Sequence, residues 1–422
     1  MLNVLDLFSG AGGLTEGFRS ESFNLLAHVE MDGDACQTLQ LRDIFSYLKK
    51  VDQLDQYYSY ITGKLTWAEL VSVVPKEVYG RVVQATISEN SIDEIIARLD
   101  VLVGDRKIDG IIGGPPCQAY STVARSRNEA KKSEDERVYL YKFYVRFLEH
   151  FKPDFFVFEN VKGLYSFKDV DGKKLLPKIK YDFSHIFNDG TENFDIDERL
   201  INSADFGVSQ TRERIIIFGR RNKFRPIHFF ESLDNLRERG PVLRQLFRDL
   251  PELNAGNTVN HYGSLQPIEF VKKYFRENDP PLTQNIARPN RDDDLEIYRI
   301  AVQKKMEGEN LKYNQLPDRL VNHRAKDIFL DRFKALDGDG YSHTVVAHIA
   351  KDGHLYIHYD LNQNRSITVR EAARIQSFPD NFYFEHSRTA AFRQIGNAVP
   401  PYLSKKFAFV ISQFDKKLSN TI

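Results

Sequence analysis

Residues 1–13, MLNVLDLFSGAGG, decide the fold class of this chain. The apolar run at residues 1–8 predicts a short buried strand, and glycines follow it at positions 10, 12 and 13. A strand, a glycine-rich turn and a helix form the opening of a nucleotide-type α/β unit. Residues 25–30 predict a second strand that ends on Glu30, where a carboxylate can accept hydrogen bonds from ribose hydroxyls. An adenosine-containing ligand and a purely structural turn are the two interpretations of this opening.

Apolar runs alternate with helical patterns through the first half of the chain. The runs at residues 108–112, 155–158 and 215–218 predict further buried strands, and residues 34–85 predict a mostly helical insertion. This alternation predicts an α/β fold, with a Rossmann-like parallel sheet and helices on both of its faces. Thr15 stands where a dinucleotide fingerprint has its third glycine, which argues against a dinucleotide-dependent oxidoreductase.

The pattern changes after residue 222. Prolines and short amphipathic pieces replace the alternation of strands and helices, which predicts a smaller, irregular second domain. Residues 343–359 alternate in hydropathy around Lys351-Asp352-Gly353, which predicts a β-hairpin. Residues 370–376 predict a helix, and the stretch from Pro401 predicts an amphipathic terminal helix.

The composition of the 422 residues is that of an ordinary globular protein. Apolar residues make up 41% and charged residues 28%, which excludes wholesale disorder. Fifty-nine basic and 59 acidic residues give a net charge of zero, which excludes a globally basic nucleic-acid coat but not a local basic cleft. Residues 212–248 hold ten basic and four acidic residues, which leaves +6. This stretch predicts either a phosphate-binding edge or a solvated face.

The cellular environment is predicted from what the sequence lacks. Two cysteines cannot build a disulfide framework or a thiolate metal site, so a reducing environment is expected. The sequence has no apolar run of about 18 residues, and Asp6 falls where a signal peptide would keep its apolar core. We therefore expect a soluble, cytoplasmic protein without a membrane partner.

Cys117 lies in the segment Gly113–Ser121, GGPPCQAYS, directly after a predicted buried strand. Open α/β sheets bind their ligands at the carboxyl ends of the strands. Two prolines stiffen the approach to the thiol, so we expect it on a rigid loop and interpret it as a nucleophile. A small apolar filler is the alternative interpretation of a lone cysteine.

Two further polar motifs accompany predicted strands. Glu159-Asn160-Val161 stands at the end of the next strand, where its carboxylate would face the same crevice as Cys117. Residues 210–214, QTRER, place Arg212 and Arg214 two residues apart, and so on one side of an extended segment. Two guanidinium groups on one side suit a phosphate or a carbonyl oxygen, and a solvated charged edge is the alternative.

Together these motifs resemble one enzyme family. They occur in a fixed order: Phe8 with its glycines, Pro-Pro-Cys-Gln at 115–118, Glu-Asn-Val at 159–161, Gln-x-Arg-x-Arg at 210–214 and QIGNAV at 394–399. In this order the chain resembles the DNA (cytosine-5) methyltransferases, particularly the bacterial modification enzymes. The resemblance covers residues 1–222 and 366–422. It implies a catalytic and cofactor-binding domain at 1–222 and 385–422, and a target recognition domain with a hinge at 223–384.

The resemblance implies S-adenosylmethionine as the cofactor, no metal, and a specific sequence of double-stranded DNA as the substrate. Cofactor-binding roles are implied for Phe8, Gly10, Gly12, Gly13, Glu30, Met31, Pro116, Leu140, Asn397 and Val399. Cys117 would add covalently to a cytosine flipped out of the helix, and Glu159 would bind the N3 edge of its ring. Arg212 and Arg214 would anchor the base and the Cys117 loop. DNA contacts are implied for Gln118, Ser121, Arg125, Arg127 and Asn160.

Residues 122–137 are polar and charged, and they suit a mobile loop that closes over the flipped base, with simple disorder as the alternative. Two positions depart from the family pattern. Met31 stands where the family usually has a tryptophan, and Gln84–Ile87 stand where an aspartate often contacts the adenine.

Two other functions are compatible with these motifs: methylation of cytosine in transfer RNA, and catalytically idle binding to DNA. The long stretch between Arg214 and Arg370 favours a DNA-reading domain, and intact Cys117 and Glu159 argue against an idle regulator. His354 and His358 lack a third nearby ligand, so we expect no metal site there. We expect a monomer, with a cognate restriction endonuclease as the candidate partner.

Overall fold

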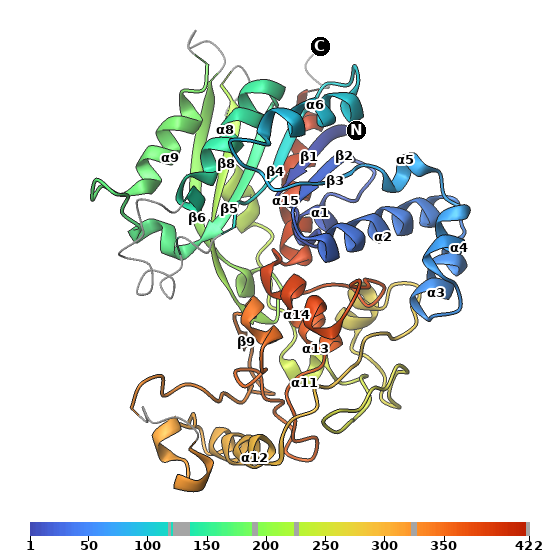
Figure 1. Ribbon diagram of the computed structural model, residues 1–422, viewed down its shortest axis with the longest axis vertical. Helices are drawn as coiled ribbons and strands as arrows, with labels where there is room; N and C mark the ends of the chain where they lie inside the picture. Colours follow the sequence, from blue (N-terminus) through green and yellow to red (C-terminus); the bar gives the residue numbers. More distant parts are fainter. Residues whose placement is uncertain (117–119, 121–135, 188–192, 223–227, 322–326, 419–422) are drawn as a thin grey trace.

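The computed structural model describes residues 1–116, 120, 136–187, 193–222, 228–321 and 327–418 (Figure 1). Within these residues the predicted strands join a seven-stranded sheet with the order β3-β2-β1-β4-β5-β8-β6. The strands are β1 Leu2–Leu7, β2 Phe23–Glu30, β3 Val82–Gln84, β4 Gly110–Gly113, β5 Phe155–Val161, β6 Phe194–Asn202 and β8 Glu213–Arg221. The strand order reverses at β1, because β2 and β4 lie on its two sides.

One edge of the sheet departs from the predicted parallel arrangement. Strands β1 to β5 pair in parallel, whereas β8 runs antiparallel to both β5 and β6. Only residues 203–212 connect β6 to β8, and Asn202 at the end of β6 pairs with Glu213 at the start of β8. A parallel pair needs a long crossover, so this connection forces the antiparallel direction. The sheet is therefore mostly parallel, which confirms the predicted α/β fold, with one antiparallel edge that the sequence pattern does not indicate.

Helices cover both faces of the sheet, as predicted. Side chains alternate across a strand, so Leu5 and Val4 of β1 enter different apolar cores. Helices α6, α8 and α9 supply the core around Leu5, and α1, α10 and α15 supply the core around Val4. Their bounds are α1 Gly13–Gly17, α6 Ile92–Val103, α8 Leu140–Phe151, α9 Leu175–Ser184, α10 Phe229–Asp234 and α15 Pro401–Leu418.

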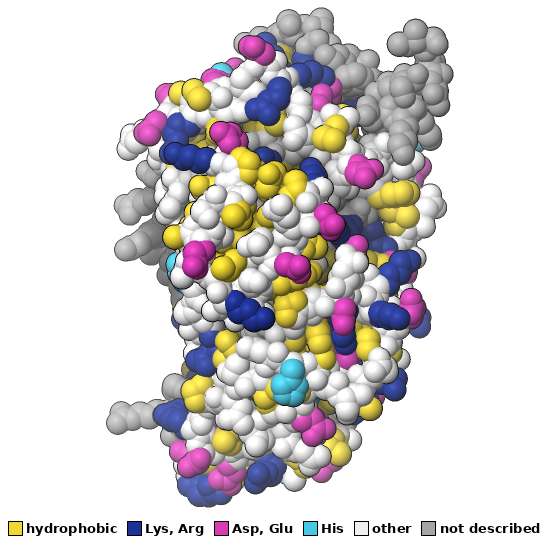
Figure 2. Space-filling model, turned by 90° about the vertical axis from the view of Figure 1, so that its right-hand side faces the viewer, with side chains coloured by type: hydrophobic (Ala, Val, Ile, Leu, Met, Phe, Trp, Pro, Cys, Tyr) yellow, Lys and Arg dark blue, Asp and Glu magenta, His cyan; other side chains and the backbone are white. Residues whose placement is uncertain are grey.

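The predicted helical insertion is confirmed. It consists of α2 Gly33–Lys50, α3 Leu54–Ile61, α4 Trp67–Ser72 and α5 Lys76–Tyr79, and its aromatic residues form a core of their own. Figure 2 looks onto this side of the molecule, where apolar side chains gather in a vertical band. The Tyr57 hydroxyl donates to the carbonyl of Asn381 at 2.7 Å, and the Tyr60 hydroxyl donates to Glu385 at 2.9 Å. The insertion therefore fastens the sheet to the C-terminal half of the chain.

Short helices and irregular segments form the lower part of Figure 1. Its core is formed in part by α11 Leu243–Leu246, α13 Val369–Ile375 and α14 Arg388–Asn397. Helix α12 Asp292–Met306 packs in a separate apolar cluster. Helices α13 and α15 confirm the helices predicted at 370–376 and from Pro401. Buried ion pairs cross this core, with Arg374 contacting Asp249 and Asp380 at 2.6 Å each.

Residues 343–359 do not form the predicted hairpin. Strand β9 Ser342–His343 pairs in parallel with β7 Gln210–Thr211 instead. Residues 347–350 form a 3₁₀ turn, and Ile357 bridges Ala335 and Ser366. Lys351 ends that 3₁₀ turn, and the next turn, at 354–355, is closed by the Tyr356 N–H, which donates to the Gly353 carbonyl at 2.9 Å. The backbone groups of His354 and Ile357 bond to the distant Lys334. The local alternation therefore reflects burial against different partners and not pairing across the turn.

The two histidines of this segment also separate. His354 Nδ1 lies 2.8 Å from the Tyr298 hydroxyl, whereas His358 is buried with its Nε2 3.6 Å from Glu371. No group of three His, Cys, Asp or Glu side chains that could hold a metal ion occurs in the part of the chain that the structure describes. His354 and His358 therefore contact different partners, Tyr298 and Glu371.

We predict that the protein loses stability as the pH falls from about 6.5 toward 4. Burial lowers the pKa of His358 from 6.5 to about 4, so the unfolded chain takes up this proton at a higher pH than the folded one. Protonation of the unfolded state then lowers the free energy of unfolding, on the order of 3 kcal/mol once the pH reaches the folded pKa. Urea denaturation at a series of pH values measures this slope.

The control for this prediction is His358→Asn, whose side-chain oxygen can replace Nδ1 as the acceptor for the Asp360 N–H. This variant should show a shallower pH slope between 6.5 and 4. Below that window a second loss is expected, because Arg365 overcomes the effect of burial and lowers the pKa of Glu371 to about 2. An unchanged slope in the variant would mean that other groups cause the acid sensitivity.

Candidate active site

The carboxyl ends of the central strands bring the predicted site residues to one edge of the sheet. In the register of the sheet, Leu7 pairs with both Val29 and Gly113, and Gly113 pairs with Phe158. The residues that follow these positions therefore leave the sheet at the same level. Ligands of open α/β sheets bind at this edge, where the strand order reverses. The order reverses at β1, directly before the glycine-rich turn.

The turn after β1 has an unusual backbone. Phe8, Gly10 and Gly12 all adopt left-handed conformations, with φ of 55°, 54° and 85°. Glycine adopts this region without strain, but a non-glycine residue there costs about 1–3 kcal/mol, and such residues gather at functional sites. The half-buried Phe8 ring is therefore held in place by its surroundings at the mouth of the turn.

Glu30 bonds to the glycine turn from the end of β2. Its carboxylate accepts hydrogen bonds from the backbone N–H of Gly10 at 2.7 Å and of Asp32 at 2.8 Å. Burial raises the pKa of Glu30, although these N–H donors act in the opposite direction. Met31 follows with 57% of its side chain exposed, an unusual degree for a large apolar residue. Glu30 and Met31 therefore present a carboxylate and an apolar side chain beside the glycine turn.

The C-terminal motif packs against the glycine turn from the other end of the chain. A Cβ atom at Gly13 would lie 2.3 Å from the Val399 carbonyl oxygen, so only glycine fits there. A Cβ atom at Gly396 would lie equally close to the backbone nitrogen of Ala347. Asn397 is exposed at the end of α14, while Val399 is buried against the turn. The motif is thus a seam between the glycine turn and the C-terminal half.

The segment that leads to Cys117 runs past Glu159. A Cβ atom at Gly114 would lie 2.3 Å from the Glu159 carbonyl oxygen and 3.0 Å from its Oε2. The Asn160 amide donates to the carbonyl of Pro115 at 3.3 Å. Half-buried Pro116 is the last residue of this segment that is described. Outside the described residues lie Cys117, Gln118, Ser121, Arg125, Arg127 and all but the last two residues of the loop predicted at 122–137.

Beyond that loop the chain returns to the sheet. Tyr120 is buried and its hydroxyl donates to the carbonyl of Val138 at 2.6 Å. The 3₁₀ turn Glu136–Tyr139 leads into α8, whose first residue, the half-buried Leu140, is a predicted cofactor contact. The two ends of the predicted loop are therefore held side by side.

Arg214 and Glu159 form an ion pair on neighbouring strands. Arg214 Nε lies 2.9 Å from Glu159 Oε1, and both side chains are mostly buried. The pair orients the carboxylate that Gly114 approaches. A carboxylate and a guanidinium placed side by side can bind a ring that offers both a donor and an acceptor edge.

Arg212 does not share the side of Arg214, which corrects the prediction from their spacing. It is 2% exposed, and its guanidinium donates to the carbonyls of Val345 at 2.8 Å and Gly396 at 3.4 Å. The reason is that β7 ends just before Arg212 and β8 begins just after it, so Arg212 lies in a break between the strands while Arg214 belongs to β8. Gln210 was missed as a functional residue, although it bonds Gln376 at 2.6 Å and the Val345 N–H at 2.8 Å.

Cys36 differs from a reactive cysteine. It is buried, and its thiol donates to the carbonyl of Glu30 at 3.4 Å. Burial, together with the negative charges of Glu30 and Asp32, raises the pKa of Cys36 to about 12. Because the thiolate is the nucleophile, Cys36 is unreactive at neutral pH. Cys117 is the remaining cysteine of the chain.

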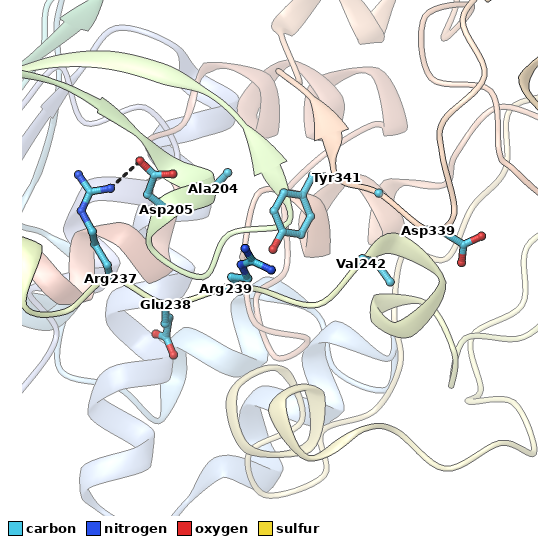
Figure 3. Close-up of a pocket in the computed structure, with 9 residues that line it drawn as sticks. Ala204, Asp205, Arg237, Glu238, Arg239, Val242, Asp339 and Tyr341 are labelled. Carbon is cyan, nitrogen blue, oxygen red and sulfur yellow. Dashed lines mark hydrogen bonds and ion pairs between the residues drawn. The ribbon is translucent and has the colours of Figure 1, made fainter. Parts of the chain in front are cut away.

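A cavity of about 640 Å³ is lined by residues 204–205, 237–239, 242 and 339–341 (Figure 3). Arg237 pairs with Asp205 across it at 2.9 Å, and Arg244 pairs with Asp339 at 3.0 Å. None of the predicted site residues lines it. These arginines already have acidic partners, so the predicted basic edge at 212–248 is not a continuous strip of unpaired cations.

Comparison with known proteins identifies the family. A model described as C-5 cytosine-specific DNA methylase matches residues 2–62 and 43–413. The Type II methyltransferase M.Bpa9945I of Bacillus paralicheniformis is 40% identical over 95% of this chain and 96% of its own length. The Type II methyltransferase M.AgeI of Thalassovita gelatinovora is 28% identical over 97% of this chain and 99% of its own.

Solved structures share the fold. A prophage-encoded E. coli protein, described as a candidate DNA modification methyltransferase, has a TM-score of 0.62 at 22% identity and covers 99% of this chain and 100% of its own. The S. pombe Dnmt2 methyltransferase has a TM-score of 0.51 at 14% identity, with 99% of each chain covered. No helix among the described residues is long and apolar enough to span a bilayer. From its match to the family model and its identity to M.Bpa9945I, the chain belongs to the C-5 cytosine-specific DNA methylase family.

Proposed function

We propose that this DNA (cytosine-5) methyltransferase of the Type II modification kind uses S-adenosylmethionine and forms a transient covalent bond between Cys117 and a flipped cytosine. One observation carries the proposal. The segment leading to Cys117 fits against Glu159 only because residue 114 is glycine, and Glu159 is oriented by Arg214. The segment that leads to the proposed nucleophile therefore lies against a carboxylate that a guanidinium orients.

The residues around the turn fit S-adenosylmethionine. The left-handed turn leaves backbone accessible to the amino-acid end of the ligand, and Glu30 offers its carboxylate to the ribose hydroxyls. When bound, this cofactor supplies an electrophilic methyl group. The proposed binding set is Phe8, Gly10, Gly12, Gly13, Glu30, Met31, Pro116, Leu140, Asn397 and Val399.

The protein groups activate the cytosine. Carbon 5 of the ring is a weak nucleophile, and addition of the Cys117 thiolate at carbon 6 makes it enamine-like and reactive. Negative charge then spreads toward N3 and O2 of the ring. Glu159 holds a proton at N3, and the Arg214 guanidinium stabilises O2. Loss of the carbon 5 proton and expulsion of Cys117 return the thiolate.

The proposed substrate is duplex DNA, in which a stacked cytosine cannot reach the reacting groups of the protein. The target base must swing out of the helix, at a cost of a few kcal/mol. We assign sequence reading to residues 223–384, joined to the catalytic part through the contacts of Gln210 and Arg212. Gln118, Ser121, Arg125, Arg127 and Asn160 remain the proposed DNA contacts. We further propose that the enzyme acts as a monomer in a restriction-modification system.

The test is incubation of the purified full-length protein with methyl-labelled S-adenosylmethionine and either duplex DNA or transfer RNA. We expect label in DNA alone, recovered as 5-methylcytosine after digestion to nucleosides. Bisulfite sequencing of the methylated DNA then reads the target sequence. Label found only in RNA, or recovered as a different methylated base, would overturn the proposal.

A further inference from the structure

Three polar side chains lie buried directly beneath the glycine turn, and the chemistry above does not use them. Asp6, Thr15 and His28 are each at most 1% exposed. Asp6 stands in β1 two residues before Phe8, and Thr15 stands in α1 two residues after Gly13. The Thr15 hydroxyl donates to Asp6 Oδ2, so one hydrogen bond joins the two ends of the turn.

A row of alternating charges supports this bond from below. His28 Nδ1 lies 3.5 Å from Asp6 Oδ2, and its Nε2 lies 3.6 Å from Asp43 Oδ1 on α2. Asp43 in turn accepts from Arg19 at 2.7 Å. Burial acts to lower the pKa of His28, but Asp43 and Asp6 outweigh it and raise that pKa, which favours a positive charge between two negative ones.

The row explains how a charge can remain in the core. A buried carboxylate without a partner is strongly unfavourable, whereas one with an opposite charge and a hydrogen-bond donor is tolerated. Asp6 has the Thr15 hydroxyl on one side and His28 on the other. The arrangement therefore fixes where the Asp6 carboxylate points, and with it the position of Thr15.

The turn needs such a support because its own bonds close only part of it. The Gly12 N–H donates to the Ser9 carbonyl at 2.9 Å, and the Ser9 hydroxyl donates to the Asp6 carbonyl at 3.0 Å. The Glu16 N–H donates to the Gly12 carbonyl at 2.8 Å, but this bond ties the helix to the end of the turn and not to β1. The hydroxyl of Thr15 links the helix to Asp6 of β1, which accounts for a threonine at the position where a dinucleotide fingerprint has glycine.

We propose that Thr15, Asp6 and His28 are positioning residues that hold the glycine turn in the shape that receives the amino-acid end of S-adenosylmethionine, without touching it. This inference rests on the proposed use of that cofactor. If the turn can adopt other conformations, fixing it in one of them on binding costs free energy, and the affinity for the cofactor falls. The DNA-binding surface, formed elsewhere, is unaffected.

The test compares Thr15→Val, which keeps the branched shape but removes the donor, with Thr15→Ser, which keeps the hydroxyl. Isothermal titration of the full-length protein with S-adenosylmethionine should show about tenfold weaker binding for Thr15→Val and binding within about twofold of wild type for Thr15→Ser. In steady-state assays Thr15→Val should raise KM for the cofactor and leave kcat and duplex DNA affinity unchanged.

His28→Asn provides an independent variant in case Thr15→Val does not fold. The asparagine side chain cannot carry a positive charge between Asp6 and Asp43, so we expect weaker cofactor binding with unchanged DNA affinity. Wild-type cofactor affinity in folded Thr15→Val and His28→Asn would overturn the inference, as would an equal loss of cofactor and DNA binding in both. Failure of the wild-type protein to bind the cofactor would instead count against the proposed function.

Discussion

Cys117→Ala is expected to abolish methyl transfer while cofactor and DNA binding persist. Without the thiolate, carbon 5 of cytosine is not activated, so the rate should fall on the order of 10⁴-fold or more. The measurement is incorporation of labelled methyl groups into duplex DNA, alongside titrations of S-adenosylmethionine and DNA with the same variant. Binding should be within a few-fold of wild type because the thiol acts only on the ring.

The matched control is Cys36→Ala, which removes the other thiol. Because Cys36 is buried with its pKa raised to about 12, this variant should keep wild-type turnover. Duplex DNA carrying 5-fluorocytosine should trap the wild-type protein and Cys36→Ala covalently, since the fluorine cannot leave as a proton does. Turnover by Cys117→Ala within about tenfold of wild type would place the nucleophile elsewhere.

The parts of the site that the sequence predicted are those set by local patterns. Short apolar runs gave the central strands, and residues at the ends of parallel strands must meet at one edge of the sheet. This reasoning predicts that the Glu159 carboxylate faces the same crevice as Cys117. Cys117 lies outside the described residues, so this stays a prediction, and it is supported by the close approach of Gly114, three residues earlier, to Glu159. Strand ends are predictable because burial of apolar runs is a local property.

Partners that are distant in the chain could not be predicted in this way. Arg212 and Arg214 have the same spacing as two residues on one strand face, but one bonds to Val345 and the other to Glu159. Alternating hydropathy at 343–359 predicted a hairpin, yet Ile357 bridges Ala335 and Ser366. Periodicity reports which side chains are buried, and it does not report what buries them.

A different signal could have revealed the buried row of charges. Asp6 and His28 are titratable residues among the apolar residues of the strands LNVLDL and FNLLAHVE. Such residues are rarely buried without partners, so each predicts a complementary group nearby. Asp6 was interpreted only as a break in an apolar stretch, and Thr15 only as a missing glycine. The sequence marks that partners exist without identifying Asp43 or Arg19.

Glu159→Gln is expected to reduce kcat by about 10²–10³ while cofactor affinity stays at the wild-type value. The amide keeps the shape that fits against Gly114, but it cannot deliver a proton to N3 of the ring. It also pairs less strongly with Arg214, whose Nε lies 2.9 Å from the carboxylate. The measurement is single-turnover methylation of duplex DNA at saturating cofactor, which separates chemistry from binding and release.

A neighbouring glutamate supplies the control that isolates this chemistry. Glu213 precedes Arg214 on β8 and pairs with Lys162 at 2.8 Å, but its side chain is 41% exposed. Exposed ion pairs contribute about 0–1 kcal/mol, so Glu213→Gln should change neither stability nor kcat appreciably. If Glu159→Gln kept more than about a tenth of wild-type kcat, its role would be confined to orienting Arg214, and proton delivery at N3 would need another donor. A large loss confined to Glu159→Gln, with Glu213→Gln unchanged, requires the carboxyl group itself at the reacting base.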